Sequence, residues 1–400
     1  MLTTAFVLFA LTNMACFYID YKQNHPFLLI WAFNVPFVVI PFFYSIVTTS
    51  VEVDVLFNVI IFSLLCNLTY LITNFIFIRC GFFHVKCFNL ESINSGLNEF
   101  YSKVWLYFAL SLLLFIIILY FPNYESSRGG ALQLGAMYAI MFMSSFLYLF
   151  YEKKSPLLWL AVISCLFFLI VFKSRGALAY VIVPFIFIYI IKGINFKKLA
   201  LLFMTSIMLL MLVIFIKSYR WLSNDGGGDF HQLMDTAFYI FSVLLTKGEL
   251  ALINNFYGAY IVCENSPMHC YNWTLIDKLL IARFTDEPTL NAAYVIWNLI
   301  EGNPNVGGSL HSLSYGVSFF DGKWFGVIYF FFLSFFRVQV FYLMKNKYSL
   351  MFLGPVIYFT LFFSRGSMYN AIMPLIACFI IYFIVRFVYK NFRKPYLNEQ

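Results

Sequence analysis

Residues 55–78 read VLFNVIIFSLLCNLTYLITNFIFI, a run with no Asp, Glu, Lys, Arg or His. A run of roughly 17–25 apolar residues is long enough to cross the hydrocarbon core of a bilayer as a helix. Hydrocarbon offers no hydrogen-bond partner to a backbone N–H, so such a segment must satisfy its own backbone by forming a helix. The stretch therefore predicts a membrane-spanning α-helix.

Similar apolar runs recur along the chain. With 55–78 they give eleven candidate spans: 3–18, 27–47, 55–78, 104–121, 131–151, 156–172, 177–191, 199–216, 324–344, 348–363 and 367–385. Apolar residues make up 62% of the 400 residues and charged residues 11%, whereas soluble globular chains average about 45–50% and about 25%. So few charges exclude a cytosolic enzyme, a secreted disulfide scaffold, a disordered chain and a nucleic-acid binder. The predicted fold class is an all-α polytopic integral membrane protein with about 11 transmembrane helices.

Lysine and arginine orient these spans, because cytoplasmic loops are enriched in both residues. Alternate loops, from the one with Lys22 to the tail with Lys394, hold 15 of the 26 basic residues and are predicted to be cytoplasmic. The N-terminus is then outside and the C-terminus inside. Three regions follow: an N-terminal membrane bundle of about eight spans (1–216), a large outer loop with short amphipathic helices (217–323), and a C-terminal bundle of about three spans with a cytoplasmic tail (324–400).

Ionisable side chains are almost absent from the predicted spans. Arg337 is the only one, and we expect it to extend its guanidinium toward the inner surface. Ion-coupled transporters usually need intramembrane carboxylates or histidines, so this class is disfavoured. The chain also has no HExxH motif and no phosphate-binding P-loop. Any chemistry is therefore expected at the outer face.

A Ser-Arg-Gly tripeptide occurs three times on the predicted outer side, each directly before a span that runs inward. Serine can cap the following helix, whose first N–H groups and dipole then attract an anion. Arginine adds a planar, always charged fork that suits phosphate oxygens. Three such sites would suit a diphosphate, although each arginine could instead anchor its helix among lipid headgroups. The tripeptides are Ser127-Arg128-Gly129, Ser174-Arg175-Gly176 and Ser364-Arg365-Gly366.

Taken together, three features resemble the oligosaccharide repeat-unit polymerases of the O-antigen (Wzy) class, which are related to the O-antigen ligases. They are Ser174-Arg175-Gly176 between middle spans, a long outer loop with Arg220 and Arg283, and the glycine-rich segment 307–316 followed by Gly322 and Gly326. The resemblance implies a GT-C-like glycosyltransferase in the bacterial inner membrane, with its active face in the periplasm. Its substrates would be undecaprenyl-diphosphate-linked oligosaccharides, joined without a metal ion or other cofactor. A polysaccharide chain-length regulator is a further implied partner, and no nucleic acid is involved.

The implied reaction needs cations for the departing diphosphate and a base for the attacking sugar hydroxyl. The expected diphosphate-binding residues are Arg175, Arg220, Arg283, Arg365 and Arg128. His311, between Gly307-Gly308 and Tyr315-Gly316 near the mouth of span 324–344, is the preferred base. In the ligases a similarly placed histidine is usually followed by Asn, whereas Ser312 follows here. Glu301 is the alternative base, and Asp321 is a weaker one.

Three other functions remain open: an O-antigen ligase, a lipid-linked oligosaccharide flippase, and a non-catalytic scaffold of an export complex. A flippase should show matched halves, short loops and a charged central cavity, whereas here the halves do not match, one loop holds 107 residues and the predicted spans lack charge. The outer arginines are unexplained by a scaffold. A ligase differs from a polymerase only in its acceptor.

Two cysteines of the outer loop, Cys263 and Cys270, can form a disulfide in an oxidising compartment. A metal site that adds His269 is the alternative, but a fourth ligand is not evident. Cys80, in a predicted cytoplasmic loop, is expected to stay reduced.

Overall fold

A computed structural model describes residues 1–82, 231–237, 252–265, 312–344 and 349–366, together with isolated positions elsewhere. Every regular element in these residues is a helix. Four segments among them are long and apolar enough to cross a membrane: Leu2–Lys22, Leu28–Thr48, Val53–Arg79 and Leu313–Tyr342. The protein is thus all-helical over the described part, as predicted, with helices of membrane-spanning character.

The N-terminal helices are α1 (Leu2–Lys22), α2 (Leu28–Asn34), α3 (Ile40–Thr48) and α4 (Val53–Arg79). A π-helical turn, Val35–Val39, joins α2 to α3, so these two form one interrupted span. Pro36 and Pro41 lie at the starts of the π-turn and of α3. Proline lacks an N–H and its ring clashes with the carbonyl four residues earlier, which accounts for the irregular turn.

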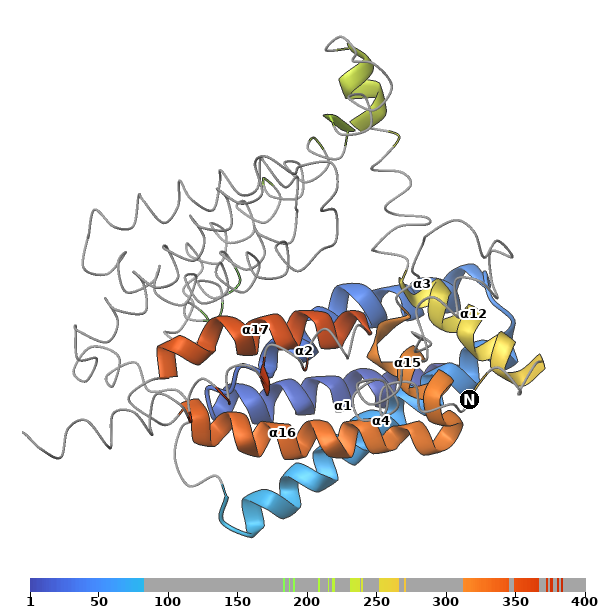
Figure 1. The fold of residues 1–400 in the computed structure, drawn as a ribbon. Helices are drawn as coiled ribbons and strands as arrows, with labels where there is room; N and C mark the ends of the chain where they lie inside the picture. The colour runs from blue at the N-terminus through green and yellow to red at the C-terminus, as the bar shows by residue number, and fades with distance from the viewer. Residues whose placement is uncertain are drawn as a thin grey trace, which may run out of the picture.

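The later elements are α12 (Leu252–Asn265), α15 (Leu313–Gly322), the 3-10 turn η6 (Lys323–Val327), α16 (Ile328–Met344) and α17 (Ser349–Arg365). Helices α16 and α17 run side by side, and α12 and α15 meet at the end of the bundle where the chain begins (Figure 1). Helix α1 packs on α2 and α4, α16 on α4 and α17, and α15 on α12 and α17. Residues far apart in sequence therefore share one bundle.

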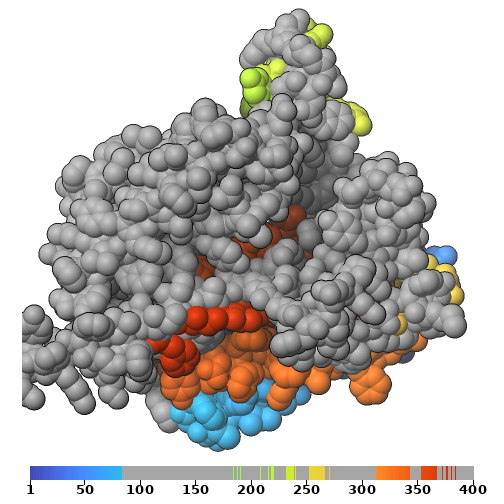
Figure 2. All heavy atoms as spheres, viewed as in Figure 1, coloured from blue at the N-terminus to red at the C-terminus, as the bar shows by residue number. Residues whose placement is uncertain are grey.

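Aromatic rings fill much of the core between these helices. Tyr315 of α15 stacks on Phe330 of α16, and Phe62 of α4 contacts Phe256, Phe319 and Trp324 edge to face. Large apolar side chains such as Leu11, Phe75 and Phe335 are instead exposed on the outside of α1, α4 and α16. In the space-filling view, atoms of α4 and α16 lie together along one edge of the molecule (Figure 2). An apolar exterior of this kind is typical of a surface that contacts lipid or another protein.

Five predicted spans coincide with helices: 3–18, 27–47, 55–78, 324–344 and 348–363. The other six, and so the total of eleven, lie outside the described residues except at isolated helical positions. Two ends differ from the prediction. Helix α1 continues to Lys22 and carries Asp20 into the bundle, and a helix begins at Leu313, within the predicted outer loop.

Candidate functional site

The end of α17 and the beginning of α15 are in direct contact. Gly366 ends α17 in the left-handed region, with φ of +86°. A Cβ atom on Gly366 would lie 2.5 Å from the carbonyl oxygen of Leu313 and 3.0 Å from Cγ2 of Val317. Only glycine allows both this backbone conformation and this approach. Arg365, the residue before it, is half-buried at the same junction.

The prediction that Ser364 caps the helix after it is wrong. Ser364 lies in the last turn of α17, and its hydroxyl donates to the carbonyl of Thr360 at 2.8 Å. A glycine with positive φ is a common way for a helix to end, so the tripeptide terminates α17. Arg365 therefore stands at a helix C-terminus, where its charge suits the helix dipole. The N-terminus that lies against Gly366 is that of α15.

The residue that Gly366 touches is close in sequence to another predicted site residue. Leu313, which touches Gly366, is two residues after His311, the preferred base. His311 itself lies outside the described residues, as do Glu301, Arg128, Arg175, Arg220 and Arg283. Their predicted roles stay predictions.

Helix α15 is buried at every residue and carries several polar side chains. The hydroxyl oxygens of Ser312, Ser314 and Ser318 have no hydrogen-bond partner within the part of the chain that the structure describes. The carboxylate of Asp321, the weaker candidate base, accepts a hydrogen bond from the hydroxyl of Tyr329 at 2.8 Å. This buried hydrogen bond links the end of α15 to the beginning of α16, across η6.

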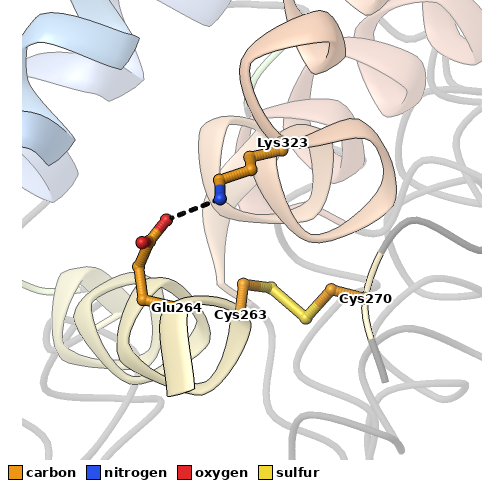
Figure 3. Close-up of a disulfide and its surroundings, with 4 residues drawn as sticks. All are labelled: Cys263, Glu264, Cys270 and Lys323. Atoms are coloured by element: carbon orange, nitrogen blue, oxygen red, sulfur yellow. Dashed lines mark ion pairs between the residues drawn. A yellow bond between two sulfur atoms is a disulfide. The ribbon is translucent and has the colours of Figure 1, made fainter. Parts of the chain in front are cut away.

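A disulfide closes the segment that follows α12, and an ion pair links α12 to the start of η6 (Figure 3). Cys263 and Cys270 are bonded, with their Cα atoms 5.6 Å apart, which confirms the pairing that the sequence left as one of two interpretations. The carboxylate of Glu264 lies 3.1 Å from Nζ of Lys323, where η6 begins. Both side chains are more than one third exposed, so this pair adds little stability by itself.

A buried hydrogen-bond network of asparagines positions α15 against the N-terminal helices. The hydroxyl of Tyr315 donates to Asn67 of α4 and accepts from Asn34 of α2, both at 2.8 Å. Asn34 also donates to Asn13 of α1 at 3.2 Å. All four side chains are nearly inaccessible to solvent, so their polar atoms gain most from one another.

A second buried polar cluster, which we call the Asp20 cluster, lies where α1, α2, α4 and α16 meet. The Asp20 carboxylate accepts three hydrogen bonds: from Nε of Arg337 at 2.5 Å, from Nε1 of Trp31 at 2.8 Å and from the hydroxyl of Tyr70 at 2.8 Å. Arg337 also donates to Asn74 of α4 at 3.1 Å. A buried charge pair with further hydrogen bonds of this kind is costly to form and very costly to break.

The turn between α1 and α2 closes this cluster. Gln23 accepts from Arg337, and the His25 ring contacts the carbonyl oxygen of Arg337 at 3.1 Å through Nε2. Because Nδ1 of His25 accepts from the N–H of Phe27, Nε2 is the protonated nitrogen that donates. Burial, together with the nearby Arg337 charge, lowers the pKa of His25 well below its usual value. The imidazole is therefore neutral at physiological pH.

The Asp20 cluster was missed by the sequence analysis. Arg337 is fully buried, so the expectation that it extends to the inner surface is wrong, and it is not the only ionisable residue of the spans. The sequence did contain a signal for it. Asp20 lies two residues beyond the end of run 3–18, and an arginine within a span, such as Arg337, usually pairs with an opposite charge. Since the two charges compensate each other, the cluster offers no net charge to an ion or a proton.

Comparison of the chain with protein-family models, with curated proteins and with solved structures found no match. Within the described ranges, no three His, Cys, Asp or Glu side chains gather as metal ligands. What the protein does must therefore be argued from the α15–α17 junction itself and from the residues beside it in the sequence.

Proposed function

We propose that the protein is a GT-C-like membrane glycosyltransferase that polymerises undecaprenyl-diphosphate-linked oligosaccharide units for O-antigen or a related surface polysaccharide. The observation that carries the proposal is the contact of Gly366 with Leu313. It places the α17 end with Arg365 against the start of α15, next in sequence to His311. The reaction requires a cation and a base, and the candidate base is two residues before Leu313 in the sequence.

The chemistry assigns a role to each group. An oxygen of a sugar hydroxyl on one lipid-linked unit attacks the anomeric carbon of the growing chain, and the bond from that carbon to the diphosphate oxygen breaks. His311, or alternatively Glu301, takes the hydroxyl proton. Arg365, with Arg175, Arg220, Arg283 and Arg128, stabilises the charge that grows on the polyprenyl diphosphate as it leaves.

The cysteines support a periplasmic location for this junction. The Cys263–Cys270 disulfide lies at the end of α12, which packs on α15, and disulfides persist in oxidising compartments. Cys80 follows the last residue of α4, is exposed, and is a free thiol. Because α4 is long enough to cross a membrane, the disulfide and Cys80 fit opposite sides of the inner membrane.

The glycolipid profile of cells that lack the protein tests the proposal. We expect long chains to be replaced by a single repeat unit attached to its final lipid acceptor. Full-length polymer stranded on the undecaprenyl carrier would instead indicate a ligase, which uses a different acceptor. Repeat units trapped on the inner leaflet would indicate a flippase, and either result would end the proposal.

Complementation with point variants then tests the site. His311→Ala should restore only single units, because the attacking hydroxyl loses its base. Arg365→Lys keeps the charge but loses the bidentate fork, so we expect shorter chains. Arg79→Lys, at the exposed end of α4, is the matched control and should restore wild-type length. Wild-type chains from both site variants would refute the assignment.

A further inference from the structure

Two serines of α15 differ from the other buried helical serines. Ser63, Ser334 and Ser364 each donate to the carbonyl four residues earlier, which is how a serine inside a helix usually satisfies its hydroxyl. Ser314 and Ser318 are at most 1% exposed, and their hydroxyls have no hydrogen-bond partner among the residues that the structure describes. A buried hydroxyl without a partner is unfavourable, so its presence needs an explanation.

The two serines share one face of α15, since residues four apart lie one above the other on a helix. The neighbouring faces are already occupied. Tyr315 contacts α4 and α16, and Val317 contacts Gly366. Asp321 falls on the same face as the serines, one turn further along. This face, Ser314–Ser318–Asp321, is a line of hydrogen-bonding groups that starts beside the α15–α17 junction.

The chemistry of this face favours a neutral, hydroxyl-rich ligand over an anion. A serine hydroxyl both donates and accepts, as a sugar hydroxyl does. A carboxylate accepts hydrogen bonds from sugar hydroxyls but repels a phosphate. Arg365, at the junction end, supplies the group that an anion prefers.

From these observations we propose that Ser314 and Ser318 bind hydroxyl groups of the sugar next to the diphosphate of the lipid-linked substrate. This assignment rests on the proposed function and names the residues that orient the sugar. The diphosphate lies at the Arg365 end, and the sugar extends along α15. The ligand provides the hydrogen bonds that the two hydroxyls lack within the described chain.

Two probes separate sugar binding from diphosphate binding. Purified protein in detergent is titrated with undecaprenyl diphosphate that carries one N-acetylhexosamine, and with undecaprenyl diphosphate alone. We expect wild type to prefer the glycosylated probe. Ser314→Ala and Ser318→Ala should each weaken its Kd by about five- to tenfold, the value of one hydrogen bond, and leave the Kd of the bare probe unchanged.

Thermal unfolding without ligand distinguishes a binding role from a structural one. Removing a partnerless hydroxyl should leave Tm unchanged or raise it, whereas Ser63→Ala, the control that removes a partnered hydroxyl, should lower it. A lower Tm for Ser314→Ala and Ser318→Ala would show that these hydroxyls hold the fold. Equal weakening of both probes, no weakening, or no preference in wild type would overturn sugar binding.

The two proposals fail separately. One pair of results would end the polymerase proposal but keep the serine assignment. In this pair, purified wild-type protein prefers the glycosylated probe, and cells that lack the protein still make polymer of normal length. Polymer that disappears with the gene but persists at full length in the double serine variant would do the reverse.

Discussion

Replacing Arg337 with methionine should destabilise the protein severely. The substitution leaves the Asp20 carboxylate fully buried with only the neutral donors of Trp31 and Tyr70, and it removes the hydrogen bond that Arg337 donates to the side-chain oxygen of Asn74. Breaking a buried ion pair from one side costs about 3–5 kcal/mol. A Coulomb energy of about 4 kcal/mol, for unit charges about 4 Å apart at an effective dielectric constant of about 20, falls in the same range.

A double-mutant cycle isolates this interaction. Asp20→Leu should cost a similar amount, because it leaves the guanidinium of Arg337 buried without its carboxylate. The double variant Asp20→Leu/Arg337→Met removes both charges, so its cost should fall below the sum of the single variants by about 2 kcal/mol or more. Denaturant unfolding in detergent, followed by tryptophan fluorescence, provides the three free energies.

The control is Arg79→Met, the same substitution at an exposed arginine that lies 5.2 Å from the centre of the Phe75 ring. It should change the free energy of unfolding by about 0.5 kcal/mol or less. If Arg337→Met is as mild as this control, or if the Asp20 and Arg337 costs simply add, the reasoning from a closed, buried pair is wrong.

Three further outcomes can be measured. Gly366→Ala should lower the unfolding free energy by more than about 1 kcal/mol, because φ of +86° and the nearby carbonyl both exclude a Cβ; an unchanged Tm would contradict the contact. Replacing Cys263 and Cys270 with serine should lower the free energy of unfolding by about 2–3 kcal/mol. A membrane-impermeant maleimide should label Cys80 only from the cytoplasmic side, and labelling from the periplasm would show that the topology is the opposite of the proposed one. Because the pKa of His25 is lowered on folding, its contribution to stability is present above about pH 6.5 and declines as pH falls below that value; a His25→Gln variant with the same acid dependence would exclude this histidine as the cause.

The membrane-spanning helices could be predicted from the sequence because apolar length is a local property. Val53–Arg79 matches run 55–78 to within two residues, and the interrupted Leu28–Thr48 matches run 27–47. The ends were harder to predict, since hydropathy falls wherever a polar residue appears. Asp20 ended a run on the sequence but lies inside α1, because Arg337 compensates its charge from 317 residues away.

The candidate site was predictable only in part. The Ser-Arg-Gly pattern located Arg365 but assigned Ser364 to the wrong helix, because a glycine can follow a helix end as readily as it can precede a helix start. The contact between Gly366 and Leu313 is a long-range packing event that no local pattern reports. The unpartnered hydroxyls of α15 likewise become visible only when every neighbour is placed.

The sequence distance between Asp20 and Arg337 has a consequence for biogenesis. Translation at about 5–20 residues per second adds the intervening 317 residues in roughly 15–60 s, so the nascent N-terminal helices reach the membrane well before their cation exists. Until α16 inserts, water, lipid headgroups or the insertion machinery must solvate the Asp20 carboxylate. A premature stop codon upstream of α16 would therefore yield a fragment in which the Asp20 carboxylate lacks its counter-charge. We expect membrane quality-control proteases to degrade such a fragment.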